Sequence, residues 1–255
     1  MLFAVLEVMT RSVGCVVGMN GTPLGEDYQG KGVSVNRTVN EWVLPKENKL
    51  DIFLFWPPAR DFEPRTAQAR LRVSVVDVKD GTPVGTEEIF TWTWPLPGLP
   101  EGYPFILSQP IKIPIQPATE LWNRAQPVES VSEADQRQII TLLEQFLAAL
   151  RAQDHTRLYE LSILKFQDKG RADGHSADVM RQVALEGYAE LTSGNLVSMR
   201  ELDVDRLVFD PVAGGLAVRV SYGRGQPPIV VETAEERRSV DVYVAKVDGS
   251  WVIVR

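Results

Sequence analysis

The order of its secondary-structure signals most constrains what this chain can fold into. Before about Val131 the sequence reads as short alternating apolar runs separated by turn residues and prolines. After that point come three amphipathic helical segments and then strand signals that continue to Arg255. Strands in one part, and helices followed by strands in the next, predict an α+β chain with two domains. A length of 255 residues suits two domains of ordinary size.

The first half predicts an antiparallel β-sandwich. Residues 33–38 and 71–78 alternate in polarity, and Phe90, Trp92 and Trp94 fall on one face of a further strand. The pairs at 20–21 and 80–81, Asn-Gly and Asp-Gly, favour tight hairpin turns. About seven short strands at this spacing are typical of a sandwich.

Prolines mark the end of this first part. Residues 95–117 contain seven prolines, a density that a central strand does not accept because proline has no N–H for the ladder. The sequence therefore predicts an extended connection with an edge strand near Ile111–Ile115. The predicted domains are residues 1–117 and 132–255, joined by a linker at 118–131.

The second domain begins with a helix over about 133–152. Ser132 is a good N-cap, and an acidic residue, Asp135, follows three positions later. Apolar residues then repeat at helical spacing at positions 139, 143, 146, 147 and 150. A second helix is expected after Asp154, a loop over 168–175, and a third helix after Ser176. Strands follow, and the last two flank an Asp-Gly turn at 248–249.

Two phrases in this half resemble a known superfamily. Residues 146–154, FLAALRAQD, and residues 248–253, DGSWVI, resemble the first helix and the final hairpin of the nuclear transport factor 2-like superfamily. That group includes ketosteroid isomerase and polyketide-cyclase-like proteins. The resemblance implies a cone of three helices on a strongly curved antiparallel sheet, open toward a central pocket. A cystatin-like or other α+β arrangement is the alternative.

The resemblance leaves the chemistry open, because its members include enzymes, transport adaptors and non-catalytic accessory domains. The isomerase places a tyrosine and two acids in its pocket. The apolar face of the first helix here offers Phe146 and aliphatic residues but no tyrosine. The isomerase residues are therefore not carried over to this chain.

Charge and composition exclude some functions. The net charge is −3 over residues 1–130 and −4 over residues 131–255, so neither half offers the positive surface that nucleic acid or an anionic membrane needs. Cys15 is the only cysteine, which excludes an intrachain disulfide and a cysteine-based metal site. The expected location is the cytoplasm, or the periplasm if a signal peptide has been removed. No metal and no cofactor is expected, because no nucleotide-binding or catalytic motif occurs.

A pocket in the cone would have five candidate lining residues. Two are on the predicted helices and three on the predicted strands: Tyr159, Tyr188, Arg219, Asp241 and Tyr243. The alternative for the strand residues is that they face solvent or a subunit interface, while Val240, Val242 and Val244 form the core.

Tryptophan offers a second kind of site. Five of the six tryptophans fall in the first half or the linker, at positions 42, 56, 92, 94 and 122. Exposed aromatic side chains on a sandwich face would indicate sugar or protein binding, and burial in the core is the alternative.

These observations favour a non-catalytic binding or interaction protein. We expect a bacterial accessory protein in which the first domain, or its interface, contacts a protein or glycan partner. The alternative is an isomerase, dehydratase or cyclase that uses the cone pocket for proton transfer on a small apolar ligand. A homodimer through the C-terminal sheet is a further hypothesis. A cavity with converging ionisable groups would favour the enzyme, and an interior filled by Phe146, Phe166 or Phe209 would favour binding.

Overall fold

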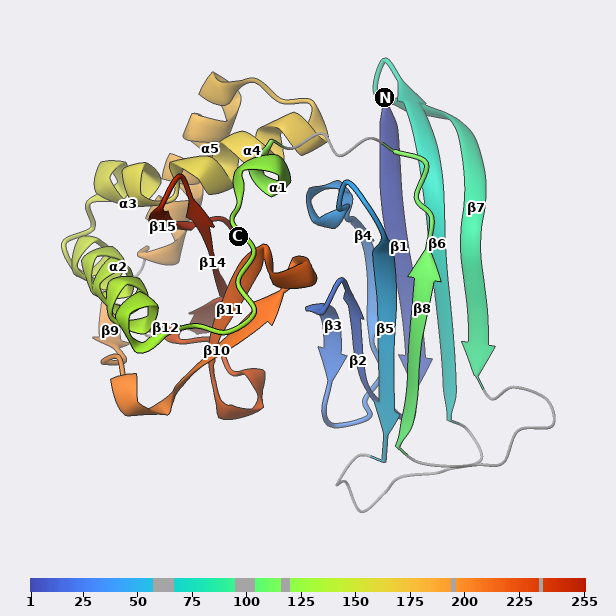
Figure 1. Cartoon of the computed structure of the whole chain (residues 1–255), viewed down its shortest axis with the longest axis horizontal. Coiled ribbons are helices and arrows are strands. Elements are labelled where there is room, and N and C mark those ends of the chain that lie inside the picture. The colour runs from blue at the N-terminus through green and yellow to red at the C-terminus, as the bar shows by residue number, and fades with distance from the viewer. Residues whose placement is uncertain (57–66, 95–103, 116–119, 194–195, 234–235) are drawn as a thin grey trace. The chain divides into compact units, whose positions relative to one another are not determined.

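The computed structural model describes residues 1–56, 67–94, 104–115, 120–193, 196–233 and 236–255 (Figure 1). Its class is α+β, with antiparallel strands first and then helices followed by antiparallel sheets. The chain divides into two compact units, Met1–Pro117 and Ala118–Arg255. Each unit is described below by itself.

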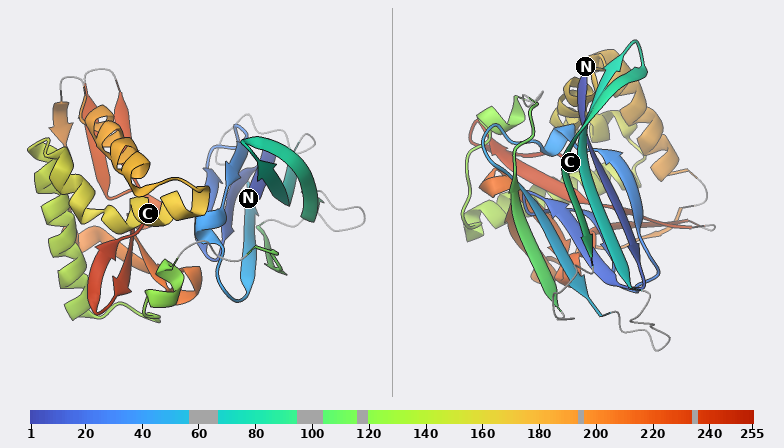
Figure 2. Two further views of the ribbon diagram at one scale, coloured as in Figure 1. Left: turned by 90° about the horizontal axis from the view of Figure 1, so that it is seen from above. Right: turned by 90° about the vertical axis from the view of Figure 1, so that its right-hand side faces the viewer.

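The first unit is a β-sandwich of two four-stranded antiparallel sheets, which lie face to face in Figures 1 and 2. The first sheet has the order β4-β1-β6-β7, and the second sheet has the order β3-β2-β5-β8. The strands are β1 (Leu2–Arg11), β2 (Gly14–Met19), β3 (Thr22–Asp27), β4 (Ser34–Thr38), β5 (Asn48–Phe55), β6 (Gln68–Lys79), β7 (Thr82–Trp94) and β8 (Phe105–Ile111). A 3-10 turn spans Asn40–Trp42.

Alternation along the strands builds the core between the two sheets. In β5, Leu50, Ile52 and Leu54 are buried, while the residues between them are more exposed. Leu6 of β1 and Leu71 of β6 are buried from the opposite sheet. Burying one such side chain contributes about 1.5–3 kcal/mol, so the two inner faces hold the sandwich together.

The hairpin between β2 and β3 turns at Asn20-Gly21, where both residues have positive φ, 57° and 78°. Two consecutive positive φ angles match the right-handed twist of the flanking strands, which confirms the predicted turn.

The predicted edge strand lies earlier than expected. The strand is β8, Phe105–Ile111, and residues 112–115 are not in a strand. Among the described strands it is an edge strand of the second sheet and pairs with β5, and an edge strand is where a sheet tolerates a proline such as Pro110. Pro114, in contrast, lies past its end. The connection expected over 95–103 lies outside the described residues.

The second unit begins with helices and ends with strands. The helices are α1 (Leu121–Arg124), α2 (Glu133–Arg151), α3 (His155–Leu161), α4 (Ile163–Asp173) and α5 (Ala177–Leu191). The strands are β9 (Leu196–Met199), β10 (Leu207–Val212), β11 (Ala217–Tyr222), β12 (Ile229–Thr233), β13 (Arg237–Val240), β14 (Val242–Val247) and β15 (Ser250–Ile253). They form two antiparallel sheets, of order β10-β11-β14-β15 and β13-β12-β9.

The two sheets of this unit are consecutive parts of the same hairpin. Val220 of β11 pairs with Val242 of β14, and Ile229 of β12 pairs with Val240 of β13. Between these two pairs, residues 221–228 on one strand and Asp241 on the other interrupt the ladder. Extra residues in one strand of an antiparallel pair let that strand bend.

The prediction of three helices with a loop over 168–175 was wrong in two places. The second helix is divided at Ser162 into α3 and α4, and α4 includes Asp168–Asp173. Gly170 has a packing role within α4, because a Cβ at this position would lie 2.5 Å from Met180 Cγ of α5. The glycine therefore brings two helices close together and does not end a helix.

Residues 120–131, which the sequence analysis assigned to a linker, contact the strands of the second unit. Ala125 forms an isolated bridge with Val247 of β14. The backbone N–H of Gln126 donates to Lys246 O at 2.8 Å, and that of Val128 donates to Gly215 O at 2.8 Å. This segment is therefore held to the sheet by backbone hydrogen bonds.

Asp135 joins the start of α2 to the final hairpin. Its backbone N–H donates to Ser132 Oγ at 3.2 Å, which completes the expected cap. Its Oδ1 accepts from Lys246 Nζ and from Trp251 Nε1, each at 2.9 Å. The hydrogen bond from Lys246, followed by those from Trp251 and Ser132, lowers the pKa of Asp135 from 3.8 to about 2.

Because folding lowers this pKa, we predict that the ionised Asp135 contributes stability that is lost at acidic pH. A carboxylate whose pKa is depressed by folding stabilises the protein above its unfolded-state pKa and stops doing so as the pH falls through the folded-state pKa. We expect Asp135→Asn to lower the free energy of unfolding by about 1–2 kcal/mol at pH 7. The difference between variant and wild type should shrink between pH 4 and pH 2 in urea titrations. A difference that is constant over this range would contradict the prediction.

None of the described helices combines the length and the apolar character that crossing a bilayer requires.

Candidate functional site

Exposed aromatic side chains gather on the outer face of the second sheet of the first unit. Tyr28, Phe53, Phe55 and Trp56, with Pro104, line a shallow cavity of about 470 Å³. Tyr28 is 45% exposed, Phe53 37% and Trp56 40%, and Ile106, which pairs with Phe53 in the next strand, is 68% exposed. We call Tyr28, Phe53, Phe55, Trp56 and Ile106 the aromatic surface.

Strand β5 positions the centre of this surface. Phe53 and Phe55 are two residues apart on one strand, so both side chains leave the same face. Their ring centroids are 5.3 Å apart with the planes inclined at 32°. On β2, Gly14 pairs with Phe55, and a Cβ there would lie 2.4 Å from the Phe55 ring. The absence of a side chain at Gly14 therefore lets the Phe55 ring lie across β2.

Hydrogen bonds to the Asp27 carboxylate shape the loop that holds Tyr28. Asp27, the last residue of β3, accepts hydrogen bonds from the backbone N–H groups of Gln29 at 2.8 Å, Gly30 at 2.9 Å and Gly32 at 2.7 Å. These bonds fix the loop after β3. The Tyr28 ring then contacts the Phe55 ring, with centroids 5.9 Å apart.

A second, smaller cavity continues the aromatic surface along the sheet. It encloses about 190 Å³ and is lined in part by Phe53 and Ile106 of the aromatic surface. Phe53 lines the first cavity as well. Its far end is polar, because Asp51 accepts from the Gly21 backbone N–H at 3.1 Å and from the Ser108 hydroxyl. The outer face thus has an apolar aromatic end and an end with a carboxylate. Its aromatic end is suited to contact with another molecule that displaces water from the rings.

The helix residues among the predicted pocket residues lie in the core. Tyr188 contacts Phe146 and Phe166 edge-on, with ring centroids 5.9 Å and 5.8 Å away. The Tyr159 ring lies 6.2 Å from that of Phe166. Burial raises the pKa of Tyr188 to about 12, and its hydroxyl lies 2.6 Å from Ser162 Oγ. A phenol with such a pKa keeps its proton at neutral pH and does not serve as a base there.

The strand residues among them lie elsewhere. Arg219 of β11 and Tyr243 of β14 are cross-strand partners, and they alternate with the valines that face the helices. Arg219 Nη2 donates to Gly225 O at 3.0 Å and lies 3.7 Å from Asp241 Oδ1. Asp241 itself is exposed. The structure brings Arg219, Tyr243 and Asp241 together, but on the face of the sheet opposite to Tyr159 and Tyr188.

The tryptophan positions in the sequence identified only part of the aromatic surface. Trp42, Trp94 and Trp122 are buried, and Trp56 is exposed on the aromatic surface. The sequence analysis did not single out Phe53 and Phe55 as site residues. The available signal was the polar Asp51 two residues before Phe53, which marks this set of positions as outward-facing.

Within the described ranges, no three His, Cys, Asp or Glu side chains are grouped as ligands of a metal ion. Cys15 is buried in the sandwich, and burial raises the pKa of its thiol, which keeps it protonated and unreactive.

A scan of protein-family models, a search of curated proteins and a search of solved structures each found no match to this chain.

Proposed function

We propose that this chain is a non-catalytic binding protein whose first unit docks a protein partner through the aromatic surface. The observation that carries this proposal is the set of neighbouring exposed rings on one sheet face. Soluble proteins rarely leave large apolar side chains together on the surface unless they contact another molecule. Tyr, Trp and Phe are the residues that protein interfaces enrich.

The lining favours a protein over a glycan as the partner. A glycan site needs polar groups around its stacking rings, since sugar hydroxyls must replace their hydrogen bonds to water. The cavity at the aromatic end is lined by aromatic residues and a proline, and the Asp51 carboxylate lies in the neighbouring cavity. Phe53 and Phe55 are also inclined to each other, so they do not offer one flat stacking plane.

For the second unit we propose the nuclear transport factor 2-like fold in a supporting role. Helices followed by a curved antiparallel sheet, and a last hairpin over residues 248–249, support this assignment. Phe146 and Tyr188 are buried where such folds carry a pocket, and Phe166 is packed against them. This packing favours binding over proton transfer, and no described feature favours the enzyme alternative.

Site-specific photo-crosslinking tests the docking proposal. A photoreactive amino acid at position 106 of the full chain, expressed in the organism of origin, should yield a covalent adduct with one protein. The matched control places the same group at Val84, an exposed position on β7 of the other sheet. An adduct at both positions, an adduct with a second copy of this chain, or no protein adduct at position 106 would overturn the proposal.

Truncating the centre of the surface should weaken this binding strongly. A central aromatic residue in an interface contributes about 2 kcal/mol or more, so we expect Phe53→Ser to weaken binding of the identified partner about 30-fold. Val84→Ser, which removes an exposed apolar group from the other sheet, should leave the affinity unchanged. Isothermal titration calorimetry on both variants, with thermal unfolding as a check on folding, measures the difference.

A further inference from the structure

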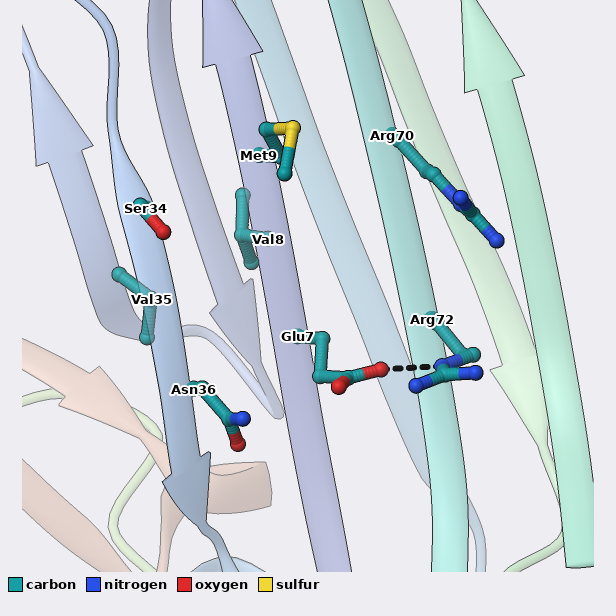
Figure 3. A pocket seen from close by; sticks show the side chains of 8 residues that line it. All are labelled: Glu7, Val8, Met9, Ser34, Val35, Asn36, Arg70 and Arg72. Atoms are coloured by element: carbon teal, nitrogen blue, oxygen red, sulfur yellow. Dashed lines mark hydrogen bonds and ion pairs between the residues drawn. The ribbon is translucent and has the colours of Figure 1, made fainter.

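A pocket lined by both polar and apolar residues lies on the outer face of the first sheet, the sheet that does not carry the aromatic surface. It encloses about 300 Å³ across β4, β1 and β6 (Figure 3). Residues from these three strands line it: Glu7, Val8, Met9, Ser34, Val35, Asn36, Arg70 and Arg72.

Strand register places the polar residues in two rows across the sheet. Glu7 on the central strand pairs with Asn36 on one side and with Arg72 on the other. The next row toward the end of β1 has Met9 between Ser34 and Arg70. Figure 3 shows the Glu7–Arg72 ion pair at one end of the pocket, and Met9 and Arg70 at the other.

Several of these groups keep hydrogen-bonding capacity for a ligand. In the part of the chain that the structure describes, the side chains of Ser34, Asn36 and Arg70 take part in no hydrogen bond or ion pair with another residue. Glu7 uses Oε2 to accept from Arg72 Nε, which leaves Oε1 and the Arg72 terminal nitrogens. The pocket therefore presents a planar cation, several neutral donors and acceptors, and one carboxylate oxygen.

We propose that this pocket binds a single sugar ring that bears a carboxylate, a sugar of the uronate class. The Arg70 guanidinium matches a carboxylate in a two-bond fork. Ser34, Asn36 and Glu7 offer the mixed donors and acceptors that neighbouring hydroxyl groups require. Met9, which is largely exposed, provides an apolar contact for the C–H face of the ring. The volume is at the lower end for ligand pockets and suits one ring.

The charge balance selects a carboxylate over a more highly charged group. Two arginines and one glutamate give the pocket a formal charge of +1 when all three are ionised. A single carboxylate neutralises this charge, whereas a dianionic phosphate would leave the occupied pocket with a net negative charge. This inference concerns a different sheet from the docking proposal, so either can fail without the other.

Titration of the labelled full chain with small probes tests the inference. We expect glucuronate to shift the NMR signals of β1, β4 and β6 with a dissociation constant in the range of about 0.1–10 mM. Glucose and acetate, which each carry half of the recognised chemistry, should bind at least about 10-fold more weakly. The ligand could be a free sugar or one residue of a polymer, and an oligosaccharide of uronates distinguishes these two sources. Tighter binding of the oligosaccharide than of glucuronate is expected only if the natural ligand is a polymer.

Matched variants complete the test. Arg70→Gln should weaken glucuronate binding about 10-fold or more and bring it close to that of glucose. Arg137→Gln, the same substitution at an exposed position on α2, should not change it. Equal binding of acetate and glucuronate, equal binding of glucose and glucuronate, no shift with any probe, or an unaffected Arg70→Gln variant would each overturn the inference.

Discussion

Replacing Asp168 with alanine should lower the free energy of unfolding of the second unit by about 3–5 kcal/mol. Asp168 of α4 accepts from Arg255 Nη2 at 2.5 Å, and each side chain is only 5% exposed. The Arg255 guanidinium also lies 5.2 Å from the centroid of the Trp122 ring and donates from Nη1 to Val254 O at 2.7 Å. Removal of the carboxylate leaves this guanidinium buried without its counter-ion, and that desolvation cost dominates the effect.

The same unit offers a control with similar geometry but different burial. Arg171 Nη1 lies 3.0 Å from Glu120 Oε2, with the two side chains 51% and 66% exposed. Arg171→Ala should cost less than about 1 kcal/mol, because water already solvates both charges. Urea unfolding followed by circular dichroism at 222 nm reports the second unit, since every described α-helix belongs to it. Equal costs for both substitutions would contradict the assignment of the large effect to burial.

A double replacement distinguishes the net contribution of the buried ion pair to stability from the cost of burying one charge without the other. We expect Asp168→Leu combined with Arg255→Met to recover most of the stability that Asp168→Ala loses, because neither charge is then buried alone.

Replacing Phe146 with alanine should also cost about 3–5 kcal/mol. Phe146 lies near the end of α2, is almost fully buried, and meets the Tyr188 ring edge-on. Truncation removes its contacts and opens a cavity in a core that includes Val218 and Val244 of the sheet. The expected cost is that of a packed interior, because the surrounding helices and strands can collapse only in part.

This substitution also tests the enzyme alternative. If the interior were a solvent-filled pocket in solution, Phe146→Ala would be cheap, since water would already occupy the space. Phe146→Leu should cost less than Phe146→Ala, because it keeps more of the apolar volume. Val183→Ala on the exposed face of α5 should change the stability by less than about 0.5 kcal/mol. Thermal or urea unfolding of the three variants distinguishes a packed core from a solvent-filled pocket.

Elements with strong local signals could be predicted from the sequence. Helix α2 was expected over 133–152 and spans Glu133–Arg151, because a serine cap and a long apolar repeat both lie within it. The last hairpin turns at Asp248 and Gly249, whose φ angles of 51° and 84° are those of a tight turn. In both cases the residues that determine the structure are neighbours in the chain.

Features that depend on distant contacts could not be predicted in this way. The division of α3 from α4 occurs at Ser162, whose hydroxyl lies against Tyr188 of α5, and Gly170 lies within α4 at a close contact with Met180 of α5. The aromatic surface was missed for a similar reason. Residues 52–56 are all apolar, so the alternation that Asp51 begins does not continue through them, and the outward-facing positions were not identified.

The contact between Asp135 and the last hairpin has a consequence during synthesis. Lys246 and Trp251 are 111 and 116 residues downstream of the carboxylate that they bind. As the chain leaves the ribosome, helices α2–α5 emerge before the strands that cover their apolar faces. The core of the second unit therefore cannot be completed until β15 has been synthesised, and during that interval the apolar faces of the helices lack their full cover of strands.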